Sequence, residues 1–177
     1  PGYTLWMTKD GLVFDSSRKA ESGESEAARS VSRLTFLGAS AGVRVEAFDP
    51  DSCRVNYFRG NDAAGWISGV PTSRAVRYSG IYPATDLKVY GTSGAVEYDW
   101  IVRPGGDPGI IRFKYVTSSG VRLSADGDLV VSTAFGDLVH HRPVCYQEVS
   151  GDRRPVPAAF KDIGEGWGAL GYAATLH

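Results

Sequence analysis

The sequence predicts an all-β fold, an antiparallel β-sandwich or meander whose strands are joined by hairpins. Three observations support this prediction. Short runs of β-forming residues alternate with polar ones, turn pairs such as Asp-Gly separate the runs at close spacing, and turn-forming residues are frequent. The chain of 177 residues contains 22 Gly and 9 Pro, which argues against long helices.

The first expected hairpin lies at the N-terminal end. Tyr3–Thr8 alternates apolar and polar side chains, residues 9–11 (Lys-Asp-Gly) turn the chain, and residues 12–14 return as a second strand. Residues 16–32 are expected to form a mobile polar loop, because they carry almost no apolar stripe that would hold a helix against a core. Further strands are expected at residues 33–37, 43–48 and 54–58.

The remaining strands are predicted by the same pattern, in which β-forming runs lie on either side of a glycine-containing turn. Residues 87–90 and Ala95–Val102 flank a Gly-Thr-Ser-Gly turn, and residues 104–109 (Pro-Gly-Gly-Asp-Pro-Gly) are expected to cross from one sheet to another. The expected strands after this crossover are residues 110–116, 121–123, 129–132, 138–141, 144–149 and 154–156.

Composition narrows the class of protein. Hydrophobic residues make up 42% and charged residues 22%, which fits a globular protein with a buried core, and the length fits a single domain over residues 1–177. The net charge of -1 gives no basic excess for nucleic acid. No apolar run approaches the roughly 20 residues that a membrane span requires.

An ordered series of motifs carries a family resemblance. The series begins with Val55-Asn56-Tyr57-Phe58-Arg59-Gly60-Asn61-Asp62. It continues, in chain order, with Trp66, Gly69-Val70-Pro71, Tyr78-Ser79-Gly80-Ile81-Tyr82-Pro83, Glu97-Tyr98-Asp99, Gly127-Asp128-Leu129 and Tyr146-Gln147-Glu148. On these motifs, over about residues 3–172, the chain resembles the uncharacterised β-rich domain near the N-terminus of large secreted bacterial proteins that carry SBBP-type β-propeller repeats.

The resemblance implies an extracellular or cell-surface, non-enzymatic domain, with other domains of the same or neighbouring chains as partners. It supplies no catalytic residues. Members of that family have further strands at both ends, so we expect the chain to be a fragment of a longer secreted protein. Sheet edges near Tyr3–Thr8 and residues 168–176 are then expected to pair with a neighbouring segment, giving a homo-oligomer or filament if the neighbour is a second copy.

Candidate chemistry is sparse. His140 and His141 are adjacent, so on a strand they point to opposite faces, one toward the core and one toward solvent, and cannot chelate one metal together. We therefore expect no catalytic residue, no metal and no cofactor. Cys53 and Cys145 allow either one disulfide or two thiols. The aspartates at residues 49–52 and 126–128 fit turn chemistry better than a calcium site.

Aromatic residues form the most informative set. Trp66, Tyr57, Tyr82 and Tyr90 are candidate ligand or interface residues, although aromatic side chains also fill the core of a sandwich. The sequence thus predicts a non-catalytic structural or interaction module that can assemble through β-strand pairing. A carbohydrate-binding module that uses exposed aromatics is the alternative, and a hydrolase with an unrecognised site is a weaker one.

Overall fold

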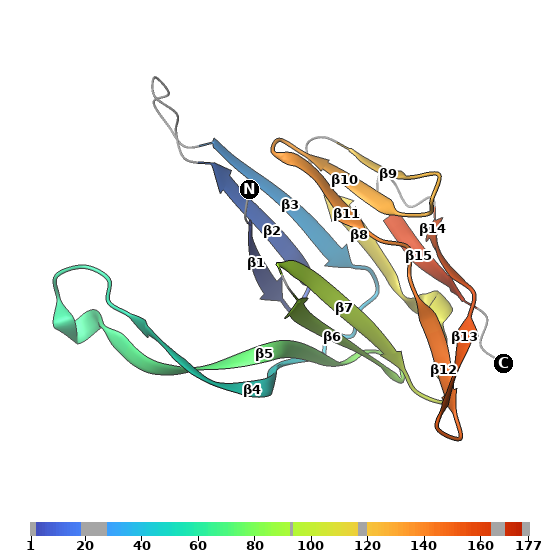
Figure 1. Ribbon diagram of the computed structural model, residues 1–177, viewed down its shortest axis with the longest axis horizontal. Helices are drawn as coiled ribbons and strands as arrows, with labels where there is room; N and C mark the ends of the chain where they lie inside the picture. The colour runs from blue at the N-terminus through green and yellow to red at the C-terminus, as the bar shows by residue number, and fades with distance from the viewer. Residues whose placement is uncertain (1–2, 19–27, 93, 117–119, 164–168, 175–177) are drawn as a thin grey trace. The chain divides into compact units, whose positions relative to one another are not determined.

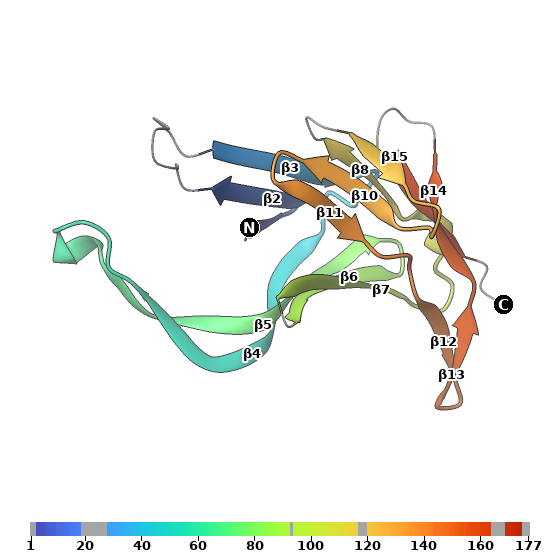
Figure 2. The same cartoon turned by 45° about the horizontal axis from the view of Figure 1, so that its top comes forward.

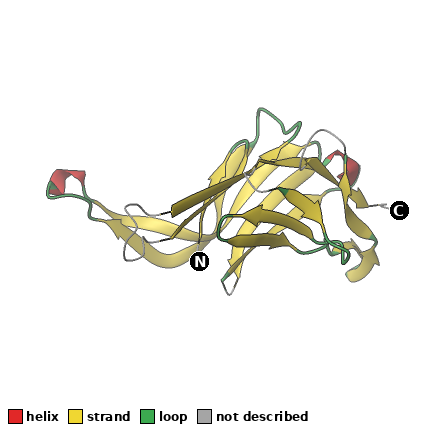
Figure 3. Cartoon of the chain, turned by 90° about the horizontal axis from the view of Figure 1, so that it is seen from above, coloured by secondary structure: helices red, strands yellow, loops and turns green. Residues whose placement is uncertain are grey.

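The computed structural model describes residues 3–18, 28–92, 94–116, 120–163 and 169–174, and it confirms the all-β prediction. Within these ranges the helical elements are two single turns of 3-10 helix, η1 (Ala63–Gly65) and η2 (Pro108–Ile110), and all strand pairs are antiparallel (Figure 3). The chain expected as one domain divides into two compact units, residues 1–39 with 107–177 and residues 40–106.

The first unit is built on a six-stranded sheet (Figure 1). Buried side chains alternate with more exposed ones along Ala28–Phe36 and Arg112–Val116, as expected for a sheet with one face in a core. In spatial order the strands are β1 (Tyr3–Thr8), β2 (Gly11–Arg18), β3 (Ala28–Phe36), β8 (Arg112–Val116), β15 (Ala169–Ala174) and β14 (Ala158–Asp162).

A three-stranded sheet packs on one face of this larger sheet. Its strands are β11 (Gly136–His140), β10 (Leu129–Thr133) and β9 (Val121–Leu123), and a separate hairpin consists of β12 (Cys145–Val149) and β13 (Asp152–Val156). The ring of His140 lies 6.1 Å from that of Phe14 and 5.4 Å from that of Tyr115, between centroids. These three side chains come from β11, β2 and β8, so the two sheets share one aromatic core.

The second unit is a four-stranded meander. Its strands are β4 (Arg44–Tyr57), β5 (Ile67–Tyr82), β6 (Thr85–Thr92) and β7 (Ala95–Val102), in that spatial order. Tyr78 pairs with Leu87 across β5 and β6, and both side chains are buried, as is Val89 two residues further along the same face. The expected hairpin at residues 87–102 is confirmed as β6 and β7, and the crossover at residues 104–109 joins the two units through η2.

Three expectations are wrong in detail. The polar loop expected at residues 16–32 is shorter, because residues 16–18 end β2 and residues 28–32 begin β3, while residues 19–27 lie outside the described residues. The two strands expected at 43–48 and 54–58 are one strand, β4, which continues through a bulge at Pro50 to Arg54. No strand was expected over β5, because Gly69, Pro71 and Gly80 resemble turn signals.

The expected sheet edges divide into one confirmed and one wrong. Strand β1 pairs only with β2 in the described residues, so Tyr3–Thr8 is an edge of the six-stranded sheet. Strand β15 covers most of the C-terminal segment, residues 168–176, and it pairs with β8 on one side and β14 on the other. Strand β15 is therefore internal, and among the described strands β14 forms the second edge.

We expect His140 to make folding sensitive to mild acid. Burial, together with the charge of the neighbouring His141, lowers the pKa of His140 from 6.5 to about 4. As pH falls from 6.5 to about 4, the His140 imidazole becomes protonated in the unfolded chain but stays neutral in the folded chain. The free energy of unfolding therefore decreases over this pH range, by about 3 kcal/mol in all. Urea unfolding at several pH values, with wild type beside His140→Phe, measures this difference.

The matched control is His141→Gln, because the His141 side chain is 84% exposed and forms only a surface pair with Asp128. Because burial is the main cause of the lowered His140 pKa, we expect His141→Gln to keep most of the wild-type loss of stability between pH 6.5 and 4, whereas His140→Phe flattens the profile. Parallel profiles for wild type and His140→Phe between pH 7 and 4 would contradict the prediction.

Candidate functional site

The feature of the second unit with the clearest functional character is a long two-stranded arm (Figures 1 and 2). Strand β6 pairs with β5 only between Ala75 and Tyr82, whereas β4 and β5 pair with each other from Arg44–Ser79 out to Tyr57–Ile67. Residues 49–74, here called the arm, therefore have no third strand beside them in the described part of the chain. A strand pair alone is marginally stable, so the arm needs its own local contacts.

Hydrogen bonds across the bulges hold the two strands of the arm together. The guanidinium of Arg54 donates to the carbonyl of Gly69 at 2.7 Å, and the Asn56 side-chain oxygen accepts from the Gly69 N–H at 2.7 Å. The Thr72 hydroxyl donates to the Cys53 carbonyl at 2.8 Å. These side chains replace the ladder bonds that a bulge interrupts.

The turn at the end of the arm is also ordered by specific contacts. Asp62 caps η1 by accepting from the Ala64 N–H at 2.9 Å, and the Trp66 indole N–H donates to the carbonyl of Gly60 at 3.2 Å. The rings of Phe58 and Trp66 meet edge to face, with centroids 5.2 Å apart and planes at 62°. The end of the arm thus has a defined shape, with η1 at its tip (Figure 3).

Apolar side chains gather at this end and stay exposed to solvent. We call them the tip cluster, and its members with their exposed fractions are Val55 (38%), Tyr57 (46%), Phe58 (61%), Trp66 (44%) and Ile67 (58%). Contiguous exposed apolar side chains on a protein surface mark interaction sites, and aromatic residues dominate the binding energy of protein interfaces.

Charged side chains of both signs also lie on the arm. Hydrogen bonds from the backbone N–H groups of Cys53 and Ser52 lower the pKa of Asp51, which stays ionised on the arm. Across the whole arm, three aspartates balance three arginines, so its net charge is zero. The chemistry available at the tip is therefore apolar and aromatic contact.

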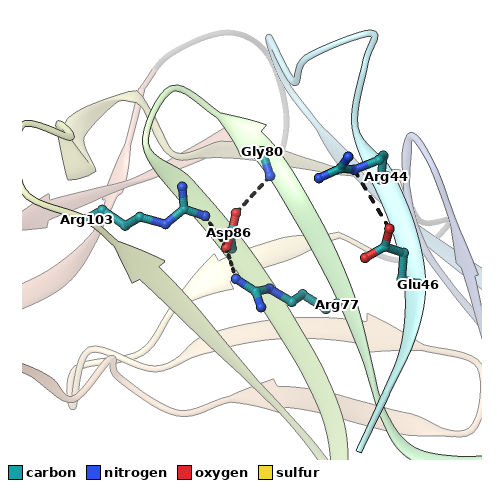
Figure 4. Close-up of polar contacts among 6 residues, drawn as sticks. All are labelled: Arg44, Glu46, Arg77, Gly80, Asp86 and Arg103. Atoms are coloured by element: carbon teal, nitrogen blue, oxygen red, sulfur yellow. Dashed lines mark hydrogen bonds and ion pairs between the residues drawn. The ribbon is translucent and has the colours of Figure 1, made fainter.

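The second unit also contains one buried ionic cluster, shown in Figure 4. The Asp86 carboxylate is fully buried and accepts hydrogen bonds from Arg77, Arg103 and the Gly80 N–H, the last at 2.8 Å. Burial by itself raises the pKa of Asp86, but the hydrogen bonds from these three donors and the charge of Arg103 outweigh it and lower the pKa to about 2. The cluster joins β5, β6 and the end of β7, which makes it a structural tie.

The four aromatic residues expected from the sequence divide between two surfaces and the core. Trp66 and Tyr57 both belong to the tip cluster, which the structure brings together. Tyr82 is 3% exposed and packs against Trp100, with centroids 5.9 Å apart, so it is a core residue. Tyr90 lies on the sheet under the Lys88 ammonium, 4.7 Å from its ring centroid, and donates to Asp99.

The remaining candidate residues lie on separate elements. Cys53 is an exposed free thiol on β4 of the second unit, and Cys145 is a half-buried free thiol at the start of β12 in the first unit. His140 is buried with its Nε2 2.5 Å from the Tyr115 hydroxyl, while His141 is exposed beside Asp128, as the alternation along a strand predicts.

The candidate residues chosen from the sequence leave out the Asp86 cluster and three members of the tip cluster, Val55, Phe58 and Ile67. A signal for Asp86 exists, because it is the one acidic residue in the otherwise β-forming run of β6, where a carboxylate needs a partner. Val55 and Ile67 carry no such signal, since a β-branched residue in a strand is ordinarily a core residue.

These features define an all-β chain with an exposed two-stranded arm, in which no described helix is both long enough and apolar enough for a membrane crossing. The chain belongs to the family described as a domain of unknown function, DUF7948, whose model matches residues 1–174. Comparison with curated proteins and with solved structures finds no match.

Proposed function

We propose that this chain is a non-catalytic interaction module, secreted or at the cell surface, and that its arm binds another protein chain. The observation that carries the proposal is the tip cluster. Five apolar side chains stay exposed at the end of an arm whose local hydrogen bonds fix their positions. A fixed aromatic group loses little conformational freedom when it binds, which favours affinity.

The ring geometry favours a protein partner over a carbohydrate. Stacking of a sugar chain requires aromatic faces in one plane, but the planes of Phe58 and Trp66 meet at 62°. The Trp66 N–H is also already bonded to Gly60. An edge-to-face pair projects as a knob, and a knob fits a pocket between side chains of a protein.

The placement of the titratable groups supports a non-catalytic role. The His140 ring packs against Phe14 and Tyr115 in the core, whereas His141 is exposed on the surface, so the two imidazoles do not face a common site. The extracellular or cell-surface location rests on the resemblance to the domain that accompanies SBBP-type repeats. Its partners are then other domains of the same or neighbouring chains.

We expect a photo-reactive phenylalanine analogue at position 58 to cross-link one defined polypeptide when the protein is produced in its native cells. The partner, once purified, should bind Trp66→Ser about 30-fold more weakly than wild type, because an interface aromatic contributes about 2 kcal/mol. The unfolding free energy of the variant should fall by only about 1 kcal/mol, because Trp66 is half exposed and gives up one hydrogen bond and one ring contact at the end of the arm.

The matched control is Tyr146, an aromatic residue of the β12–β13 hairpin that is 45% exposed, close to the exposure of Trp66. The analogue at position 146 should give no such adduct, and Tyr146→Ser should leave the affinity unchanged. Cross-linking at position 58 to glycans alone would overturn the proposal. So would equal cross-linking at positions 58 and 146, or equal loss of affinity in Trp66→Ser and Tyr146→Ser.

A further inference from the structure

Strand β1 is an edge strand that lacks the devices by which edges avoid pairing. Its six residues, Tyr3–Thr8, pair with β2 in one unbroken register, without a bulge. They include no charged residue and no proline. An edge of this kind presents a straight row of backbone N–H and C=O groups to any strand that approaches.

The other sheet edges in the described residues are protected, which makes β1 the exception. Each of them contains a charge, a proline, a bulge or only three residues. The protecting features are Lys161 and Asp162 in β14, Pro50 and a bulge in β4, Glu97 and Asp99 in β7, the shortness of β9, Asp137 in β11, Glu148 in β12, and Arg153 with Pro155 in β13.

Three apolar side chains of β1, those of Tyr3, Leu5 and Met7, face the core side of the sheet but are only partly covered. Leu5 lies opposite Phe14 and Met7 opposite Leu12, and both of these β2 side chains are buried. Met7 is nevertheless 37% exposed, and Tyr3 and Leu5 are half-buried. Tyr3 also lines a cavity of about 150 Å³. Water satisfies the backbone groups of an edge but not this apolar strip.

We propose that β1 pairs antiparallel with β1 of a second copy of the chain, about a two-fold axis at Leu5. In an antiparallel pair, residues directly opposite each other share a face, so the register must place odd-numbered residues opposite odd-numbered ones. The Leu5 axis puts Leu5 opposite itself and Tyr3 opposite Met7. It thereby joins two six-stranded sheets and covers the apolar strip of both copies.

The second copy is the occupant that β1 itself fits best. A neutral strand meets a neutral strand without charge repulsion, and each Tyr3 gains the flexible thioether of Met7, a favourable aromatic contact. This surface is separate from the arm, so the dimer and the proposed function can each fail without the other.

Sedimentation velocity and hydrogen exchange across a concentration series test the proposal. We expect a monomer–dimer equilibrium, with the amides of β1 protected more at high concentration and those of β14 unaffected. Leu5→Lys places two ammonium groups opposite each other and should weaken the dimer at least about hundredfold. Ala159→Lys, an exposed position on the β14 edge, is the matched control and should leave the dimer unchanged.

The exchange measurement uses unaltered protein, so the test remains decisive if Leu5→Lys fails to fold. A monomer throughout the series, with β1 exchange independent of concentration, would overturn the proposal. A dimer abolished by Trp66→Ser would overturn it as well, because the contact would then lie on the arm. A longer chain that includes residues before residue 1 is measured in parallel. If its β1 amides are protected to the same extent at every concentration, the added segment pairs with β1 within one chain, and the proposed dimer is overturned.

Discussion

Replacing Asp86 with Asn should lower the free energy of unfolding by about 3 kcal/mol and the melting temperature by about 10 °C. The carboxylate is fully buried and is the shared acceptor of Arg77, Arg103 and the Gly80 N–H (Figure 4). An amide at this position removes the negative charge and leaves two guanidinium groups close together. Breaking one partner of a buried ion cluster costs more than the cluster contributes when intact. Differential scanning calorimetry and urea unfolding measure the loss.

The same variant should change the response to strong acid. The pKa of Asp86 is lowered from 3.8 to about 2, so its contribution is complete above about pH 4 and is lost as pH falls toward 2. The shift corresponds to about 2 kcal/mol. Glu46→Gln, which alters an exposed carboxylate near Arg44, is the control and should change stability by less than about 0.5 kcal/mol. Equal losses for the two variants would refute the structural role of Asp86.

Replacing Gly11 with Ala should destabilise the first unit by about 3 kcal/mol. A Cβ atom at Gly11 would lie 1.9 Å from the carbonyl oxygen of Leu34 and 2.9 Å from its carbonyl carbon. Both atoms belong to the backbone of β3, so the contact can be relieved only by separating β2 from β3. The register of eight pairs between these strands would then be disturbed at its first pair, Gly11 with Thr35. Urea unfolding provides the measurement.

Gly65→Ala is the control for this substitution, because a Cβ atom at Gly65 meets no atom within 4 Å and its backbone needs no left-handed conformation. We expect its stability to match wild type or to rise slightly, since alanine restricts the unfolded chain. If Gly11→Ala proved as mild as Gly65→Ala, the close approach of β2 to β3 would be disproved.

Local signals predicted most strands but not how far they extend. The hairpin of β6 and β7 follows directly from two β-forming runs around a glycine turn; β7 was expected at its observed bounds, whereas β6 extends two residues beyond the expected strand at each end. The arm could not be predicted in this way, because Pro50, Gly69 and Pro71 ordinarily end a strand. They are tolerated where a strand has no further neighbour and a bulge absorbs the irregularity.

Residue type alone could not predict which aromatic side chains are buried and which are exposed. Tyr82 and Trp66 are both aromatic residues at the end of β5 or beside it, yet one packs against Trp100 and the other stays exposed at the tip. The difference is set by whether a third strand covers the hairpin at that point, which is a property of long-range pairing. The Asp86 cluster likewise depends on three segments that meet only after the sheet has formed.

The absence of a third strand beside residues 49–74, among the residues described, has a consequence for how this family can diversify. Side chains on the arm bury little area, so most substitutions there leave the sheet of β5, β6 and β7 intact. Under the proposed function, selection on mutations at the tip acts through binding, whereas selection on mutations around Asp86 acts through folding stability. Family members should accordingly differ in length and sequence at the arm while the sheet that carries it stays constant, so one scaffold can acquire new partners without first acquiring stability.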